Sequence, residues 1–364
     1  MGLKSPIPLK DLKFNTPVPY TLHVDRELFQ LTKQKLGLFR YPEEQTDFGE
    51  NNWAQGAKVS RAEERRLNAI FNHFLVKIDV PGYGPLVLHF THTNSTRPSA
   101  IPLLFSHDWP GSFVEAVRVV RPLTEPEDAR DPAFYFVASS IPGCGFSPAP
   151  TKSGVGPNVV ARAYKILMTD VLRYPKFVTR GGDFGSFITR SIAIQYPQVV
   201  RAQHLNMFPV PPPTLWSAPC AYLRWCLSAL TYSNFEHESL RVRRNFEQDQ
   251  SGYLEEQKTR PQTLGFALGD SPLGLLAWEA FGRGMRQAEK TFETYVSVPY
   301  GVSMYKKEQL NCPRDWAAQA ANILYWREYD RGGHFAFLER PDLFVHDLRS
   351  FFSSPVVMQA YARQ

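Results

Sequence analysis

Short apolar runs that alternate with helical segments limit the fold of this chain more than any other feature of its sequence. Each apolar run is followed by a stretch with helical periodicity, in the pairs 101–105 and 113–120, 134–138 and 159–172, and 177–179 and 184–196. Strands that are apolar throughout are buried on both faces, as they are in parallel sheets. Helices between such strands cover the two faces of the sheet. The sequence therefore predicts an α/β fold with a mostly parallel sheet and helices on both faces.

Residues 1–75 follow a different pattern and are predicted to form an N-terminal extension. Leucine and valine residues at helical spacing in residues 20–40 predict an amphipathic helix. The polar, turn-rich residues 47–56 predict a meander after that helix. Apolar residues alternate at 76–80 and 86–90 on either side of a Pro- and Gly-rich turn, and this pattern predicts a β-hairpin that opens the core.

The alternation of strands and helices stops near residue 207 and then resumes. Residues 207–290 are rich in Pro, Trp and Tyr, which predicts an inserted and mainly helical lid. Apolar runs at 295–302 and 323–326 and a closing helix at 343–352 continue the earlier pattern. The predicted core therefore has two parts, one before the lid and one after it, at residues 76–206 and 291–364.

Charge and cysteine usage exclude several classes of function. The formal net charge is +6, but Lys and Arg alternate with acidic residues, and the basic residues 240–244 are predicted to form a solvated helix face rather than a nucleic-acid site. The four Cys residues are scattered, so neither a zinc site nor a disulfide framework is predicted. No apolar run approaches the length of a membrane span, and residues 1–6 lack the pattern of a signal peptide. We therefore expect a cytoplasmic protein with no metal, cofactor or nucleic-acid partner.

The strongest local signal is the sequence Gly-Gly-Asp-Phe-Gly at residues 181–185, between a short apolar run and a helical segment. Glycines on both sides allow a sharp turn from strand to helix, which exposes the central side chain above the helix N-terminus. Most enzymes with this elbow carry Ser at its centre, whereas this chain carries Asp183. A carboxylate needs no base to activate it and can attack an sp³ carbon, such as a carbon of an epoxide. Asp183 is therefore the predicted nucleophile, and its alternative role is that of an ordinary helix cap.

Attack by a carboxylate leaves an ester, so the chain must also supply a base that activates water for hydrolysis. His334 lies in the sequence Arg-Gly-Gly-His-Phe after the last apolar run, at the predicted C-terminal edge of the sheet. Glu308 follows another strand at the same edge and is the predicted partner that orients the imidazole. Asp315 and Asp330 are weaker rivals for that role. The predicted order along the chain is nucleophile, acid and base.

Ester hydrolysis also develops an oxyanion, which two hydrogen-bond donors must stabilise. Residues 107–112, His-Asp-Trp-Pro-Gly-Ser, follow the first long strand of the core and are expected to supply one backbone N–H. Phe184, directly after the nucleophile, is expected to supply the other. His107 is expected to be structural, and the bond between Trp109 and Pro110 is a candidate for a cis peptide.

In this order, the motifs resemble those of the epoxide hydrolases of the α/β-hydrolase superfamily, in the branch with an N-terminal extension that microsomal and fungal enzymes share. The resemblance covers nearly the whole chain, through segments at residues 31–36, 39–42, 107–112, 141–147, 181–185, 269–275 and 331–335. It implies an α/β-hydrolase core and the opening of a small hydrophobic epoxide to a vicinal diol without a cofactor. A homodimer is one expected assembly.

The resemblance also implies roles for individual residues. The matching residues are the nucleophile Asp183, the base His334, its partner Glu308, and the oxyanion donors Trp109 and Phe184. The family uses two lid tyrosines that bind the epoxide oxygen and protonate the leaving alkoxide. Tyr253, in the sequence Ser-Gly-Tyr-Leu, matches the first of them. The other interpretation of Tyr253 is a packing role in the lid.

Three departures from the family pattern accompany these matches. Asp108 occupies a position where the family has Gly, which could strain the backbone or alter the charge near the oxyanion hole. The chain is short between residues 276 and 298, and the segment with the second tyrosine is missing there. It is also short between residues 56 and 66, where the family has a helix rich in Trp and Arg.

These departures leave alternatives beside an epoxide hydrolase. A haloalkane dehalogenase has the same triad, but it usually needs an indole N–H beside the nucleophile, and residue 184 is Phe. The second alternative is a non-hydrolytic or inactive protein of this fold, with a binding or cyclisation role in a biosynthetic pathway. Phe, Trp and Tyr make up 13% of the residues and are frequent in the lid, which favours a hydrophobic substrate in each case.

Overall fold

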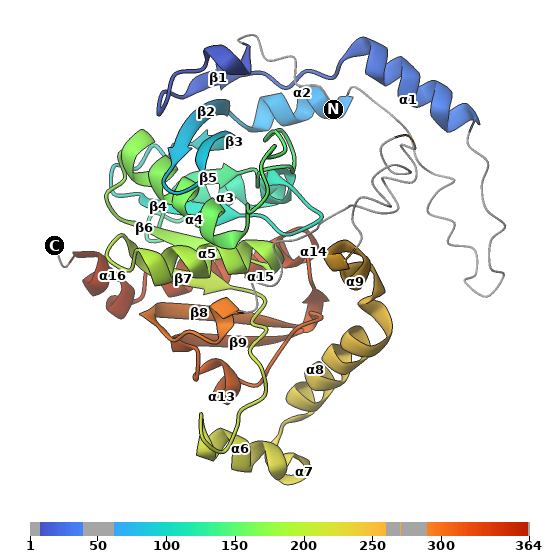
Figure 1. The fold of residues 1–364 in the computed structure, drawn as a ribbon. Coiled ribbons are helices and arrows are strands. Elements are labelled where there is room, and N and C mark those ends of the chain that lie inside the picture. Colours follow the sequence, from blue (N-terminus) through green and yellow to red (C-terminus); the bar gives the residue numbers. More distant parts are fainter. Residues whose placement is uncertain (1–7, 39–61, 260–269, 271–289, 363–364) are drawn as a thin grey trace.

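The computed structural model describes residues 8–38, 62–259, 270 and 290–362, and its centre is a twisted sheet (Figure 1). Within these residues the sheet has nine strands in the order β1-β2-β3-β5-β4-β6-β7-β8-β9. The pairs β1·β2, β2·β3 and β3·β5 are antiparallel, and the other pairs are parallel. The strands are β1 Val18–Tyr20, β2 His73–Val80, β3 Gly84–Thr93, β4 Ile101–Ser106, β5 Phe134–Ser139, β6 Phe177–Gly181, β7 Val200–Leu205, β8 Val296–Lys307 and β9 Ala321–Gly333. The predicted mostly parallel sheet is confirmed.

Helices cover both faces of this sheet, and each face has its own hydrophobic core. On one face, α4 Pro157–Ile166 and α5 Asp183–Gln195 pack against the strands through side chains such as Tyr164 and Ile188. On the other face, α3 Val120–Thr124 and α15 Pro341–Phe352 bury Leu123 and Phe351. The remaining helical elements of the core are η4 Phe113–Arg118, η5 Leu167–Val171, η7 Lys290–Phe292, α13 Arg314–Ala317, α14 Ala336–Glu339 and α16 Pro355–Ala362.

The predicted lid is helical in the part that the structure describes. Its elements are α6 Pro219–Cys226, α7 Ser228–Thr231, α8 Asn234–Asn245, the π-helical turn η6 Phe246–Gln250 and α9 Gly252–Thr259. Ser233 and Glu236 form a capping box that begins α8, because each side chain binds the backbone N–H of the other residue. In Figure 1 these helices are coloured yellow to gold, and α8 lies beside β8.

Two buried or partly buried arginines hold the chain near the two ends of the lid. Arg243 in α8 donates to the carbonyl oxygen of Val210 at 2.8 Å, near the start of the lid. Arg190 in α5 is fully buried and donates to the carbonyl oxygens of Thr291 at 3.0 Å and Thr294 at 2.8 Å, where the chain returns to the core. Carbonyl oxygens held by a charged donor form strong hydrogen bonds. Arg243 therefore joins α8 to the first residues of the lid, and Arg190 fixes the chain where it returns to the core.

The N-terminal extension agrees with its predicted elements where it is described. Helix α1 Arg26–Leu38 and the hairpin of β2 and β3 are confirmed, and α2 Ala62–Ile70 precedes the hairpin. Helix α1 buries none of its side chains and lies apart from the sheet in Figure 1. The predicted meander at residues 47–56 and the short regions near residues 60 and 280 lie wholly or mostly outside the described residues. The predicted boundaries of the extension, the core and the lid stay predictions.

Strand β7 was absent from the elements expected from the sequence. It carries polar residues in the interior of the sheet, so its sequence lacks the continuous apolar pattern of its neighbours. Gln203 donates to the carbonyl oxygen of Thr189, and His204 forms a 3.0 Å hydrogen bond with the hydroxyl of Ser303. Buried polar groups are tolerated where hydrogen bonds satisfy them.

None of the described helices is long and apolar enough to cross a membrane.

Candidate active site

The predicted elbow joins strand β6 to helix α5. Asp183 is the first residue of α5 and has a φ of +37°, in a region that residues other than glycine seldom adopt. At Gly185, a Cβ atom would lie 2.3 Å from the carbonyl oxygen of Ser106, so only glycine allows the helix to approach β4 this closely. The strand, the glycines and the strained residue together direct the carboxylate of Asp183 to the C-terminal edge of the sheet.

The Asp183 carboxylate lies between backbone donors and an imidazole. The N–H of Trp109 donates to Oδ1 at 2.9 Å, and Nε2 of His334 is 3.6 Å from Oδ2. Burial raises the pKa of Asp183, while the charge of His334 and hydrogen bonds from the N–H groups of Trp109 and Phe184 oppose that rise. The structure therefore brings the two predicted oxyanion donors and the predicted base to one carboxylate.

His334 directly follows β9 and is held by the carboxylate of Glu308, which directly follows β8. Nδ1 of His334 is 2.9 Å from Oε2 and 3.1 Å from Oε1 of Glu308, and the Glu308 side chain is fully buried. The N–H of Leu310 donates to the same carboxylate at 3.2 Å. Burial lowers the pKa of His334, but the negative charges of Glu308 and Asp183 outweigh it and hold this pKa well above its usual value of 6.5. The two neighbouring acidic groups therefore favour the protonated form of His334 in the free site.

The two rival acids lie away from this imidazole. Asp315 forms an ion pair with Arg224 of the lid at 2.9 Å. Asp330 is exposed and lies 3.8 Å from Lys306. Of the three candidates, Glu308 is the one that hydrogen-bonds to His334.

Tyr253 in α9 brings the lid over the nucleophile. Its ring stacks on that of Trp109, with centroids 5.9 Å apart and an interplanar angle of 15°, and it meets Phe246 edge to face. Burial raises the pKa of Tyr253 to about 12, and the charges of Asp183 and Glu308 contribute to this rise. The phenol is therefore protonated at neutral pH and can donate a proton.

Asp108 and His107 behave differently from each other in the loop after β4. Nδ1 of His107 donates to the carbonyl oxygen of Asp108 at 2.8 Å, and its Nε2 accepts the N–H of Ile141 at 3.0 Å, so the imidazole is structural as predicted. The Trp109–Pro110 bond is cis, as the sequence indicated. Asp108 is not among the residues with a positive φ, so the backbone strain considered for this position is not present. The other possibility, an altered charge near the oxyanion hole, stays a prediction.

Arg180 and Asn206 belong to the site but were not selected from the sequence. Both side chains are fully buried, and Asn206 donates from Nδ2 to the carbonyl oxygen of His334 at 3.1 Å. The available signal for Arg180 was a charged residue in the short apolar strand that precedes the elbow. Asn206 follows β7, the strand that the sequence pattern did not indicate, so its place at the sheet edge was hidden.

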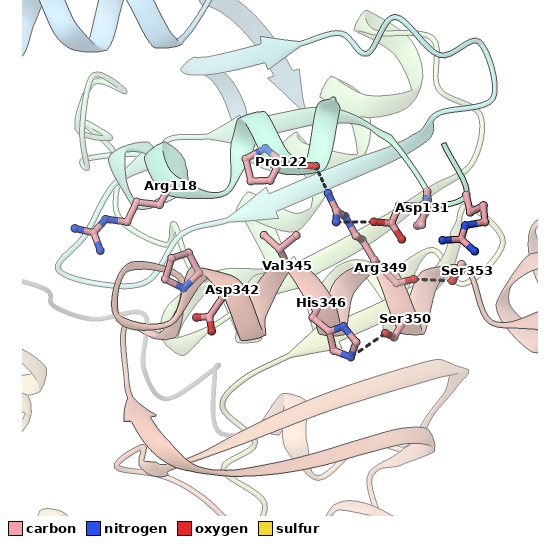
Figure 2. Close-up of a pocket in the computed structure, with 12 residues that line it drawn as sticks. Arg118, Pro122, Asp131, Asp342, Val345, His346, Arg349, Ser350 and Ser353 are labelled. Atoms are coloured by element: carbon pink, nitrogen blue, oxygen red, sulfur yellow. Dashed lines mark hydrogen bonds and ion pairs between the residues drawn. The ribbon is translucent and has the colours of Figure 1, made fainter. Parts of the chain in front are cut away.

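A separate surface cavity of about 530 Å³ lies between α3 and α15, away from these residues (Figure 2). Its wall includes Arg349, which donates to Asp131 at 2.7 Å and to the carbonyl oxygen of Pro122 at 2.6 Å. These charges are already paired within the protein. The cavity contains none of the predicted site residues, so we do not place the chemistry there.

In the described part of the chain, no group of three or more His, Cys, Asp or Glu residues is arranged to hold a metal ion.

Comparison with known proteins agrees with the fold. Residues 17–116 match the family described as "Epoxide hydrolase N terminus". The chain is 30% identical to juvenile hormone epoxide hydrolase 2 of Ctenocephalides felis over 94% of this chain and 86% of that protein. It is 29% identical to epoxide hydrolase 1 of Sus scrofa over 77% of this chain and 74% of that protein.

Solved structures show the same relationship. The epoxide hydrolase of Aspergillus niger has 27% sequence identity and a TM-score of 0.77, and the match covers 92% of this chain and 95% of that one. The juvenile hormone epoxide hydrolase of Bombyx mori has a TM-score of 0.80 over 97% of this chain and 96% of that one, and its 22% identity supports the fold alone. This chain therefore belongs to the epoxide hydrolases of the α/β-hydrolase fold.

Proposed function

We propose that this enzyme converts an epoxide to a vicinal diol through an ester on Asp183. The observation that carries this proposal is the position of the Asp183 carboxylate, which lies between the N–H of Trp109 at 2.9 Å and Nε2 of His334 at 3.6 Å. A carboxylate in this setting can attack carbon and then be freed by water. The relatives that match most of the chain are named epoxide hydrolases, so the binding or cyclisation alternative is not favoured.

In the first step Asp183 opens the ring. Its Oδ1 accepts the N–H of Trp109, and its Oδ2, which lies 3.6 Å from Nε2 of His334, attacks a ring carbon. The C–O bond of the ring breaks as the ester bond forms, and Tyr253 donates its phenolic proton to the leaving oxygen. Attack by a carboxylate consumes no base, so His334 is not needed at this stage.

In the second step His334 directs water at the ester. Ester formation removes the negative charge of Asp183, which is one of the charges that hold the pKa of His334 high. The imidazolium can then release its proton, which replaces the one given up by Tyr253. Neutral His334 accepts a proton from water, and the oxygen of that water attacks the ester carbon. The N–H groups of Trp109 and Phe184 stabilise the oxyanion until the diol leaves with the proton from His334.

A single turnover in ¹⁸O-labelled water tests the covalent path. The oxygen from water is expected to enter the Asp183 carboxylate, and the first diol released should contain the oxygen that Asp183 gave up. Mass spectrometry of the diol and of the peptide with Asp183 measures both products. Label in the first-turnover diol would mean that water opens the ring directly, and it would overturn the proposal.

Replacement of Tyr253 by Phe is expected to slow ester formation by about 100- to 1000-fold, because a strongly basic alkoxide then leaves without its proton donor. Rapid quenching followed by mass detection of the ester measures this rate. Tyr222→Phe is the matched control, because it removes a hydroxyl from α6 of the same lid, and its rate should be unchanged. A near-normal rate in Tyr253→Phe would assign proton donation to another group, such as Tyr295 or water.

The site also supports a hydrophobic substrate. The rings of Trp109, Tyr253 and Phe246 lie together beside the nucleophile, and they favour a small hydrophobic epoxide. A homodimer and a cytoplasmic location stay predictions. Light scattering tests the first of these, because a dimer has twice the 41.5 kDa mass of the chain.

A further inference from the structure

A buried ion pair lies beside the nucleophile elbow. Nη1 of Arg180 is 3.3 Å from Oδ1 of Asp108, and neither side chain is exposed to solvent. Arg180 is in β6, three residues before Asp183, and Asp108 directly precedes Trp109, whose N–H binds that nucleophile. The two charges therefore connect the strand that carries the nucleophile with the loop that carries an oxyanion donor.

Arg180 also connects to the loop that carries the base. Its Nη2 donates to Oδ1 of Asn206 at 2.6 Å, and Asn206 donates in turn to the carbonyl oxygen of His334 at 3.1 Å. The guanidinium group lies 4.7 Å from the ring centre of Phe105 and 4.6 Å from that of Phe337. These rings restrict the guanidinium, so the hydrogen bonds have a defined direction. We call Arg180, Asp108 and Asn206 the loop clamp.

The loop clamp contacts the elbow itself. A Cβ atom on Gly182 would lie 2.4 Å from Oδ1 of Asp108 and 2.5 Å from Oδ1 of Asn206. Both acceptors therefore occupy the space that a side chain at residue 182 would need, and glycine at this position lets them lie close to the elbow.

The charged groups around Asp108 make its ion pair with Arg180 unfavourable in free energy. Stability of the fold alone therefore does not explain the pair. The groups that face Asp108 are the carboxyl group of Glu115, which accepts its backbone N–H at 3.0 Å, together with Arg180, His107, Asp183, Glu308 and His334. Oδ2 of Asp108 has no hydrogen-bond partner among the described residues. Burial raises the pKa of Asp108 to about 7, although the charge of Arg180 opposes that rise. Buried ion pairs often contribute little net stability compared with apolar residues of similar size.

We propose that Arg180 and Asp108 act together as positioning residues for ester hydrolysis, by holding the Trp109 N–H and His334 in place around Asp183. This inference rests on the catalytic roles proposed above. Ring opening depends on Asp183 and Tyr253, whereas hydrolysis also depends on the two loops that the loop clamp joins. Disturbing the pair should therefore slow hydrolysis more than ring opening, and the ester should accumulate.

The experiment measures both rate constants with styrene oxide as the probe, by rapid quenching and mass detection of the ester. Arg180→Met leaves the Asp108 carboxyl group buried without its partner, and ester hydrolysis is expected to fall by about 10- to 100-fold, because small displacements of catalytic groups have effects of this size. Ring opening should change by less than about 3-fold, and the fraction of enzyme present as ester should rise. The double variant Asp108→Asn with Arg180→Gln, which replaces both charges by amides that can hydrogen-bond, should recover most of the loss.

The pH profile provides a second readout. Asp108→Asn removes one of the negative charges that raise the pKa of His334. A lower pKa keeps the imidazole neutral to lower pH, so the acid limb of the hydrolysis rate should move to lower pH, with the largest difference above about pH 7, where Asp108 of the unchanged enzyme is ionised. A variant that merely loosens the fold would lower the rate without this shift.

Arg349→Met is the matched control, because it removes another Arg–Asp ion pair, the one with Asp131 at 2.7 Å beside the cavity in Figure 2. Both of its rate constants should match those of the unchanged enzyme.

If Arg180→Met does not fold, Arg180→Lys is measured in its place, because it keeps the positive charge but loses the hydrogen-bond geometry of the guanidinium group. An equal fall in both rate constants, together with an unshifted acid limb in Asp108→Asn, overturns the inference. Absence of any ester on Asp183 in the unchanged enzyme overturns instead the function on which it rests.

Discussion

Replacement of Asp183 by Asn is expected to abolish turnover and leave the fold intact. The amide has nearly the shape of the carboxylate, but its oxygen carries no negative charge and is a poor nucleophile. The N–H of Trp109, which binds Oδ1 at 2.9 Å, can still donate to the amide oxygen. Diol formation, followed by chromatography over many hours, should fall to the background rate, while the circular dichroism spectrum and the melting temperature stay close to those of the unchanged protein.

The purity of that variant decides how its residual activity is interpreted. Conversion of Asn to Asp during storage would restore the nucleophile, so the mass of the peptide with residue 183 must be measured beside the activity. Turnover that scales with the converted fraction agrees with the assignment. Substantial turnover from protein that contains only Asn at this position would show that the carboxylate of Asp183 does not attack the substrate.

Replacement of His334 by Gln is expected to stop turnover at a different point. Ring opening by Asp183 needs no base, so the ester should form and then persist, because no group remains to accept a proton from water. Intact-protein mass spectrometry should show a mass increase equal to that of the epoxide, and peptide mapping should place it on Asp183. The amount of trapped ester should approach one per active enzyme.

Two comparisons make this result specific. Asp183→Asn treated with the same epoxide should show no mass increase, which excludes alkylation of other side chains. Glu308→Gln should retain slow turnover, because it keeps a hydrogen-bonding partner for His334 but removes the charge that stabilises the imidazolium. Loss of turnover in His334→Gln without any adduct would mean that the imidazole acts before or during ring opening.

The parts of the site that follow from local sequence were predictable. The elbow at Asp183 depends on neighbouring glycines, and the loops with Glu308 and His334 follow strands that the apolar pattern indicated. Because parallel strands place their carboxyl ends at one edge of a sheet, the meeting of these residues could be anticipated from their positions. The ends of β8 and β9 were less predictable, since both strands continue beyond their apolar runs into polar residues.

The loop clamp shows what the sequence pattern does not contain. Asp108 and Arg180 are separated by 72 residues, and their pairing depends on the order in which β4 and β6 lie in the sheet. From the sequence alone, Asp108 was a departure in a known motif and Arg180 was a charged residue in an apolar strand. Three-dimensional packing brings these two irregular positions together as one buried pair.

The attachment of the lid at both of its ends has a consequence for how such enzymes diversify. The carbonyl oxygens of Val210 and Thr291, bound by Arg243 and Arg190, mark two points at which the chain is held near the ends of the lid. The free-energy cost of a flexible connection grows only slowly with its length, by about 0.6 kcal/mol for each doubling. Segments between these points can therefore lengthen, shorten or be exchanged during evolution while the sheet and its catalytic edge stay unchanged. The part of the lid between these two points is therefore the part of the chain in which a change of length has the smallest effect on the catalytic residues.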